Sequence, residues 1–251
     1  MAAHALVVGG ARGIGAAVVA SLADAGMDVT FTYRSNADAA TEQVADLARR
    51  HPDGRFVALP LDLAERSGVE TFAAALEDGP ALSALVGVGG TTYDTLAATM
   101  DQDRAERLMQ VNFWSFTRIA RAVVRPMTRA RAGRIVAIGS VLGQLASPGS
   151  AAYAASKSAL LGYVRTLAIE TARRGVTVNY VAPGFVDTEM MAPFAAYRAA
   201  TEQRIPAGRF VTPAEVAGVV AFLVSPVAGG VTGAVIPVDG GLSASIGVPR
   251  S

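Results

Sequence analysis

The chain has 251 residues, of which 51% are apolar and 17% charged, a composition that excludes an intrinsically disordered chain. The formal net charge of +1 gives no whole-molecule case for nucleic-acid binding. With no cysteine and two histidines, His4 and His51, we expect no disulfide framework and no protein-built metal centre. No segment has the apolar length of a membrane span, and the amino terminus lacks the pattern of a signal peptide. We therefore expect a soluble, cytoplasmic protein.

Short β-rich runs alternate with longer helical patterns along the whole chain. The predicted strands cover residues 5–10, 28–33, 55–61, 82–90, 133–140, 176–183 and 233–241. The predicted helices cover residues 13–25, 37–50, 65–77, 101–130, 151–174 and 212–224. This alternation predicts an α/β fold: a single Rossmann-type, doubly wound domain over residues 1–251, with a parallel sheet flanked by helices. Ligands of such sheets bind outside the carboxyl ends of the strands, so we expect the chemistry there.

The first such segment is a glycine-rich loop between the first strand and the first helix. Gly9, Gly13 and Gly15 allow a tight turn and let backbone N–H groups approach a pyrophosphate at the helix amino terminus. After the second strand, the acidic residue typical of an NAD site is missing, and Arg34 stands there instead. Arg34 and Arg12 of the loop suit the 2′-phosphate of NADPH, although both could also be merely solvated.

A tyrosine and a lysine four residues apart, Tyr153 and Lys157, share one face of a predicted helix. A nicotinamide cofactor requires a proton donor, because hydride delivery to a carbonyl leaves negative charge on the oxygen. An ammonium nearby is expected to lower the pKa of a phenol, so Lys157 would activate Tyr153. Ser140, at the end of the fifth strand, would bond the substrate oxygen from the other side. Asn112 would hold a water that links Lys157 to solvent, or would simply be a polar residue tucked against the sheet.

Together these motifs resemble the short-chain dehydrogenase/reductase family over almost the whole chain, most closely its β-ketoacyl-(acyl carrier protein) reductases. The resemblance implies a seven-stranded sheet, a catalytic Asn112–Ser140–Tyr153–Lys157 tetrad and NADPH as cofactor. It implies tetramers or dimers, paired through the two long helices and often through the last strand. Asp62 is expected to bind the adenine amino group or to cap the next helix. The resemblance extends the cofactor-binding residues to Ile14, Ser35, Leu63, Gly89, Pro183, Gly184, Val186 and Thr188.

Two positions depart from the family pattern. A threonine that normally precedes the first loop glycine is Val8 here, and the usual Asn-Asn-Ala-Gly after the fourth strand is Gly87-Val88-Gly89-Gly90. The second change removes two amides that knit the central sheet in relatives. Either the sheet is stabilised in another way, or the cofactor pocket is wider.

The resemblance implies reduction of a 3-ketoacyl thioester on an acyl carrier protein, in fatty-acid, polyketide or polyene synthesis. Arg131 and Arg174 match the arginines that dock the carrier beside the site mouth. Arg118, Arg121, Arg125 and Arg129 form a further stripe, more consistent with a solvated or subunit-facing surface. A flap over about residues 188–211 should cover the substrate. The residues expected to contact the acyl chain are Leu142, Met190, Met191 and Phe194.

Two alternatives remain open from the sequence. One is an NADP-dependent dehydrogenase or carbonyl reductase for a free sugar, quinone or steroid. The other is a non-catalytic NADPH-binding protein, for which the altered Gly87–Gly90 segment is the sole support. An enoyl reductase fits less well, because that branch spaces its tyrosine and lysine more widely than Tyr153 and Lys157.

Overall fold

The computed structural model describes residues 3–77 and 79–245, without the side chains of residues 193 and 194. A seven-stranded, all-parallel sheet in the order β3-β2-β1-β4-β5-β6-β7 confirms the predicted doubly wound fold. The strands are β1 His4–Val8, β2 Asp28–Tyr33, β3 Phe56–Pro60, β4 Ala84–Gly87, β5 Gly133–Ile138, β6 Val176–Pro183 and β7 Val235–Val238. The strand order reverses between β1 and β4, which is where such sheets bind ligands.

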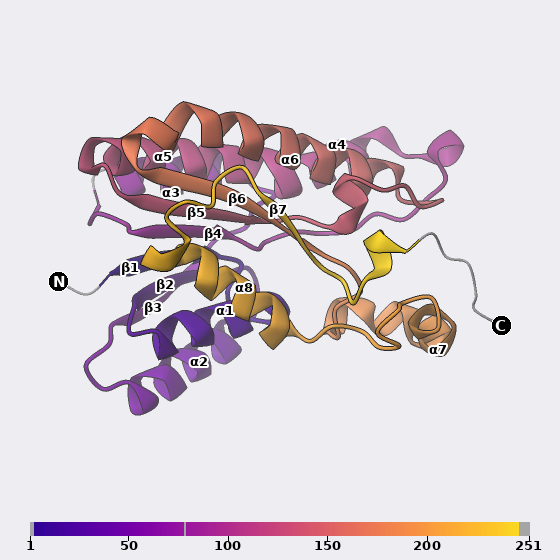
Figure 1. Ribbon diagram of the computed structural model, residues 1–251, viewed down its shortest axis with the longest axis horizontal. Coiled ribbons are helices and arrows are strands. Elements are labelled where there is room, and N and C mark those ends of the chain that lie inside the picture. The colour runs from indigo at the N-terminus through magenta and orange to yellow at the C-terminus, as the bar shows by residue number, and fades with distance from the viewer. Residues whose placement is uncertain (1–2, 78, 246–251) are drawn as a thin grey trace.

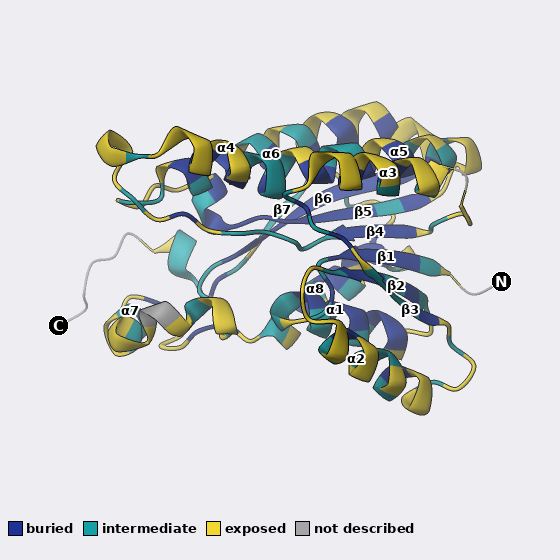
Figure 2. Cartoon of the chain, turned by 180° about the vertical axis from the view of Figure 1, so that it is seen from behind, coloured by how far each residue is buried: buried dark blue, intermediate teal, exposed yellow. Residues whose placement is uncertain are grey.

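Helices cover both faces of the sheet (Figure 1). The helices are α1 Gly13–Asp24, α2 Ala37–Arg50, α3 Arg66–Glu77, α4 Gln102–Met109, α5 Ser115–Ala130, α6 Ala151–Thr171, α7 Arg198–Glu202 and α8 Pro213–Val224. One layer holds α1, α2 and α8, and the other holds α3 to α6 (Figure 1). The central strands β1, β4, β5 and β6 are largely buried between these layers (Figure 2), as expected for near-continuous apolar runs in a parallel sheet. The edge strands β3 and β7 are partly exposed.

A capping box, which the residues Thr212 and Glu215 provide, is present at the start of α8. The Thr212 hydroxyl accepts from the Glu215 N–H at 3.2 Å, and the Glu215 carboxylate accepts from the Thr212 N–H at 2.7 Å. Two donors that a helix leaves unsatisfied are thereby bonded. Among the described residues, no helix has both the length and the apolarity that a membrane crossing requires.

Several predicted elements differ from the structure. The last strand, predicted over 233–241, covers only Val235–Val238. The helix predicted over 101–130 is two helices joined by a π-helical turn, Gln110–Trp114, which contains Asn112. The strand predicted over 82–90 is limited to Ala84–Gly87. The N–H groups of Val88 and Gly89 both donate to the Val8 carbonyl, at 2.9 and 2.8 Å, so the chain turns out of the sheet there.

Candidate active site

The glycine loop is built so tightly that its glycines cannot carry side chains. A Cβ on Gly9, whose φ is +84°, would lie 2.7 Å from the Gly89 Cα, and one on Gly15 would lie 1.9 Å from the Gly9 carbonyl oxygen. The Thr32 hydroxyl accepts from the Gly9 N–H at 3.0 Å. Thr32, one strand away, therefore braces the loop beside Val8, where the family usually has its threonine.

The amino terminus of α1 has the donors that an anionic cofactor needs. The residue that precedes the helix, Arg12, makes no side-chain cap, and the first turn of this fully described helix carries no acidic residue. Its free N–H groups can therefore bind a pyrophosphate. Arg34 and Ser35 are exposed just after β2, and the Arg12 guanidinium lies 3.8 Å from Glu189 at the start of the flap. The loop, the amides and the arginines thus fit a phosphorylated dinucleotide.

Asp62 and Leu63 follow β3 on the other side of the switch point. An Asp62 carboxylate oxygen accepts from the Ala64 N–H at 2.9 Å, and α3 begins only at Arg66, so Asp62 shapes a turn rather than capping that helix. Its second oxygen can accept from a ligand. Leu63 covers Gly89, where a Cβ would meet the leucine side chain at 2.5 Å.

The altered segment after β4 is filled by an aromatic ring. A Cβ on Gly87 would lie 2.4 Å from Phe116 of α5, so the ring occupies the space that an asparagine side chain would need. Phe116 also makes an edge-to-face contact with Tyr163, at a centroid distance of 6.2 Å. Two consequences were expected from this departure: a sheet stabilised in another way, or a wider cofactor pocket. The Phe116 ring fills the space at Gly87, so the structure supports the first of these.

Ser140, Tyr153 and Lys157 come together at the carboxyl end of β5. The Lys157 Nζ lies 5.6 Å from the centre of the Tyr153 ring and donates to the Ile138 carbonyl at 3.1 Å. The Ser140 hydroxyl accepts from the Leu142 N–H at 3.1 Å and makes a second hydrogen bond with Tyr153.

The pKa values of this group are governed mainly by burial. Burial lowers the pKa of the Lys157 ammonium to about 8. Burial raises the pKa of the Tyr153 phenol, a hydrogen bond with Ser140 opposes that rise, and the Asp94 carboxylate adds to it. Ser140 thus opposes the effect of burial on Tyr153, and activation of Tyr153 by Lys157 stays a prediction.

Asn112 is buried with its amide bonded on both sides. Its Oδ1 accepts from the Thr91 N–H at 2.8 Å, and its Nδ2 donates to the Thr91 carbonyl at 2.9 Å and to the Ser156 hydroxyl at 3.0 Å. Ser156 donates in turn to the Tyr153 carbonyl at 2.7 Å. Asn112 thus ties the segment after β4 to α6. A Cβ on Gly90 would lie 3.4 Å from the Asn112 Oδ1 and 3.5 Å from the Lys157 Nζ, and the predicted link to Lys157 through a water stays a prediction.

The segment after β6 brings the remaining predicted cofactor residues to the glycine loop. Pro183 ends β6, and the Gly184 N–H donates to the Val238 carbonyl at 3.1 Å. Val186 is buried and forms a bridge with Val211. A Cβ on Gly13 would lie 3.2 Å from the Thr188 methyl, so Thr188 sits directly over the loop.

The comparisons with known proteins agree with this geometry. The profile of a family described as enoyl-(acyl carrier protein) reductase matches residues 9–243. A 3-oxoacyl-[acyl-carrier-protein] reductase of Vibrio cholerae is 38% identical over 226 residues, 88% of this chain and 89% of the relative. The Escherichia coli reductase of the same name is 36% identical over 223 residues, 88% of this chain and 89% of its own length.

The chain belongs to the short-chain dehydrogenase/reductase family. Solved structures agree. A Beutenbergia cavernae protein proposed to be an NAD(P)-dependent gluconate 5-dehydrogenase, with NADP bound at low occupancy, is 35% identical with a TM-score of 0.92, over 97% of both chains. A short-chain dehydrogenase/reductase from Serratia marcescens is 35% identical with a TM-score of 0.89, over 96% of this chain and 98% of that one. The family comprises NAD(P)-dependent oxidoreductases.

The segment predicted to form a flap over the substrate is partly helical. It consists of a 3₁₀ helix, Glu189–Tyr197, followed by α7. Arg198 holds its base: the guanidinium donates to both carboxylate oxygens of Asp187, at 2.7 and 3.1 Å, and lies over the Phe210 ring. Met190 is 48% exposed and Met191 is half-buried, while the predicted contact Phe194 has a side chain outside the described residues.

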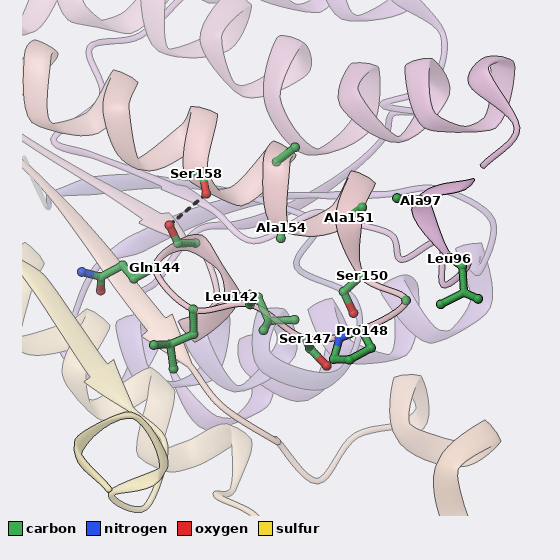
Figure 3. Close-up of a pocket in the computed structure, with 15 residues that line it drawn as sticks. Leu96, Ala97, Leu142, Gln144, Ser147, Pro148, Ser150, Ala151, Ala154 and Ser158 are labelled. Carbon is green, nitrogen blue, oxygen red and sulfur yellow. Dashed lines mark hydrogen bonds between the residues drawn. The ribbon is translucent and has the colours of Figure 1, made fainter. Parts of the chain in front are cut away.

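A cavity of about 580 Å³ lies next to α6 (Figure 3). Its α6 lining residues are Ala151, Ala154, Ala155 and Ser158. At 100° per residue, Ala151, Ala155 and Ser158 face away from Tyr153 and Lys157, and Ala154 lies about 60° from Lys157 at the edge of that face. The cavity is therefore on the other side of the helix from the tetrad, and Leu142, predicted to contact substrate, lines this cavity.

The two arginines predicted at the site mouth lie elsewhere in the subunit. Arg131 follows α5 and Arg174 precedes β6, so both are at the amino ends of the strands. Ser140 lies past the carboxyl end of β5, about 20 Å away at the rise of a strand. Within one chain, therefore, Arg131 and Arg174 do not flank the tetrad. Of the arginine stripe, Arg118 lies 3.5 Å from Glu70 in α3, which satisfies part of its charge locally.

Two polar residues of the site carry no sequence signal that identifies them. Ser156 links Asn112 to the Tyr153 backbone, and Tyr180 bonds the Ser140 backbone from β6. Both could be found only through long-range contacts, since Tyr180 is 40 residues from Ser140 along the chain.

Proposed function

We propose that the protein is an NADPH-dependent reductase that converts a 3-ketoacyl thioester on an acyl carrier protein into the 3-hydroxyacyl thioester. The observation that carries the proposal is the cluster of Ser140, Tyr153 and Lys157 beside a glycine loop at the switch point of the sheet. The names of relatives at 36–38% identity over 88% of the chain support the substrate class. Fatty-acid, polyketide and polyene pathways all contain this reaction.

The 2′-phosphate of NADPH has cationic partners available. Arg34 is exposed at the end of β2, where an acidic residue would favour NADH, and Arg12 stands in the loop. NADPH would bind along residues 9–15 and supply the hydride to the ketone carbon. Arg34→Ala should raise the KM for NADPH far more than the KM for NADH. Arg49→Ala, an exposed arginine on α2, is the matched control.

The chain's own residues handle the oxygen of the ketone. The Ser140 hydroxyl can shift its proton from Tyr153 to the carbonyl oxygen of the ketone while its lone pair keeps the bond from the Leu142 N–H. Tyr153 gives its phenolic proton to the same oxygen as negative charge develops there. Lys157, with a pKa of about 8, can return a proton to the Tyr153 phenolate near neutral pH.

Carrier docking and self-association belong to the same proposal. Arg131 and Arg174 lie at the far end of β5 from their own Ser140, so a carrier bound there would present its acyl chain to a neighbouring subunit. The assembly, a tetramer or a dimer, would cover apolar side chains that a lone subunit exposes: Trp114 at 48%, Ile169 at 81%, Phe222 at 46% and Val227 at 84%. Ile169→Glu and Val227→Glu should each yield smaller particles in analytical ultracentrifugation.

A free carbonyl compound is the second candidate, favoured by the gluconate dehydrogenase assignment of a 35% identical structure.

The test measures NADPH oxidation with acetoacetyl-carrier protein, acetoacetyl-pantetheine, 5-ketogluconate and a crotonyl thioester. Tyr153→Phe is the blank. Arg131→Ala and Arg174→Ala should lower turnover of the carrier substrate alone, with Arg49→Ala unchanged. Turnover of ketogluconate without acetoacetyl thioester would overturn the proposal, as would turnover of the crotonyl thioester alone. Tight NADPH binding without any turnover would favour a non-catalytic protein.

A further inference from the structure

Tyr180 contacts the backbones of two predicted catalytic residues, although it lies outside the tetrad. It stands in the middle of β6, opposite Ala137 of β5, and is fully buried. Its hydroxyl accepts from the Ser140 N–H at 2.9 Å. The same oxygen lies 3.2 Å from the Ser140 carbonyl and 3.3 Å from the Lys157 carbonyl, to which it can donate. One phenol therefore connects the turn after β5 with helix α6.

The turn that carries Ser140 is shaped around this ring. A Cβ on Gly139 would lie 1.7 Å from the Tyr180 Cζ, and one on Gly143 would lie 2.4 Å from its hydroxyl. Two glycines thus flank the serine at the positions where any side chain would displace the phenol. The Ser158 hydroxyl donates to the Gly143 carbonyl at 2.9 Å and fixes the same turn from α6.

The hydroxyl, and not only the ring, has a function in this arrangement. A phenylalanine could fill most of the volume, but it would leave the buried Ser140 N–H without an acceptor, which folded proteins avoid. Burial also raises the pKa of Tyr180, so the hydroxyl keeps its proton across the working range of the enzyme.

We propose that Tyr180 is a positioning residue, which sets the placement of Ser140 relative to Lys157 by bonding to both backbones. This inference rests on the proposed reductase function only for its kinetic readout. Displacing Ser140 weakens its hydrogen bond with Tyr153, a bond that lowers the pKa of that phenol. Loss of the Tyr180 hydroxyl should therefore change the chemistry and leave cofactor binding intact.

The test compares Tyr180→Phe with Tyr163→Phe, a matched control in which another core tyrosine loses its hydroxyl. Tyr163 packs edge-to-face on Phe113 and Phe116 and belongs to the same apolar cluster as Tyr180. In Tyr180→Phe we expect kcat to fall about tenfold or more, since small displacements of reacting groups have large effects. The KM and Kd for NADPH should stay within about twofold. The apparent pKa of the reduction should shift, because Ser140 and Lys157 are displaced relative to each other. A purely structural role would lower the Tm and leave that pKa in place.

A second pair of variants removes dependence on one substitution. Gly143→Ala places a methyl against the Tyr180 hydroxyl and should reproduce the loss of kcat. In the double variant Tyr180→Phe/Gly143→Ala the clash with the hydroxyl is gone, and the methyl meets the Lys157 carbonyl oxygen at 3.2 Å and the Tyr180 Cζ at 3.3 Å. The combined defect should therefore be much smaller than the sum of the two single defects. Additive defects would overturn the proposal, as would a Tyr180→Phe enzyme whose kcat matches that of Tyr163→Phe.

A readout without substrate separates this inference from the proposed function. Lys157 is the only lysine in the sequence, so ε-¹⁵N-lysine labelling gives one side-chain signal to follow with pH. In the cofactor-free protein, the pKa of the Lys157 ammonium should differ from the wild-type value in Tyr180→Phe and equal it in Tyr163→Phe. A wild-type protein without ketone turnover would refute the proposed function, while an unmoved Lys157 signal in Tyr180→Phe would refute the positioning role.

Discussion

The charge on Lys157 should destabilise the fold, and the cost should disappear as the pH rises. This lysine is 4% exposed, and burial lowers its pKa from the ordinary 10.5 to about 8. The difference corresponds to about 3 kcal/mol of folding free energy. Below pH 8 the folded and unfolded chains both hold the proton, so the full cost is present. Between pH 8 and 10.5 the unfolded chain binds more protons, and stability rises as the folded lysine becomes neutral.

Lys157→Met removes the charge and keeps the length of the side chain. Without cofactor, the variant should be more stable than the wild type at pH 7. That advantage should shrink by about 3 kcal/mol between pH 8 and 10.5. The lost hydrogen bond to the Ile138 carbonyl adds an offset that does not change with pH. Tyrosine ionisation occurs in both proteins and cancels in the difference.

Urea unfolding followed by circular dichroism measures this difference, at one protein concentration because subunits associate in the proposed assembly. The ε-¹⁵N signal of Lys157 gives the pKa directly in the same samples. A stability difference that stays flat from pH 7 to 10.5 would falsify the reasoning, and so would a measured pKa close to 10.5. Either result would mean that water reaches the ammonium.

Three further outcomes are expected. The kcat/KM for ketone reduction should fall as the pH passes about 8, because Lys157 loses its proton there; a profile flat to pH 10 would contradict this. Thr32→Val should lower the free energy of unfolding by about 1–3 kcal/mol and weaken NADPH binding, because the Gly9 N–H loses its acceptor. Calorimetry checks the stability, and a cofactor titration checks the binding. Thr212→Ala should lower the free energy of unfolding by about 1 kcal/mol without changing kcat, because it removes the cap of α8. Urea unfolding measures this loss, and an unchanged midpoint would count against the role of the cap.

Much of the fold was predictable because its signals are local. Strand and helix periodicity, the capping box of α8 and the glycine loop each depend on neighbouring residues, and all are present in the structure. The site was predictable as a set of residues, since a parallel sheet brings the ends of its strands together. Ser140 and Tyr153 accordingly meet Lys157.

What the sequence could not give depends on contacts between distant segments. The π-helical turn at Asn112 reflects its bonds to Thr91 and Ser156, which helix periodicity does not record. The pKa of Tyr153 depends on how deeply the fold buries it. Arg131 and Arg174 matched a family pattern by position, but a position in the sequence does not say which end of a strand faces the substrate.

The contact between Gly87 and Phe116 also has an evolutionary consequence. Asparagine at 87 would collide with the ring, and a smaller residue at 116 would leave a void beside glycine. Neither position can revert alone without a loss of stability, so the two must change together or in a tolerant background. Descendants of an ancestor that made this exchange should therefore keep glycine and phenylalanine as a pair. We expect relatives with glycine at the position of Gly87 to carry a large ring at the position of Phe116, whichever substrate each enzyme uses.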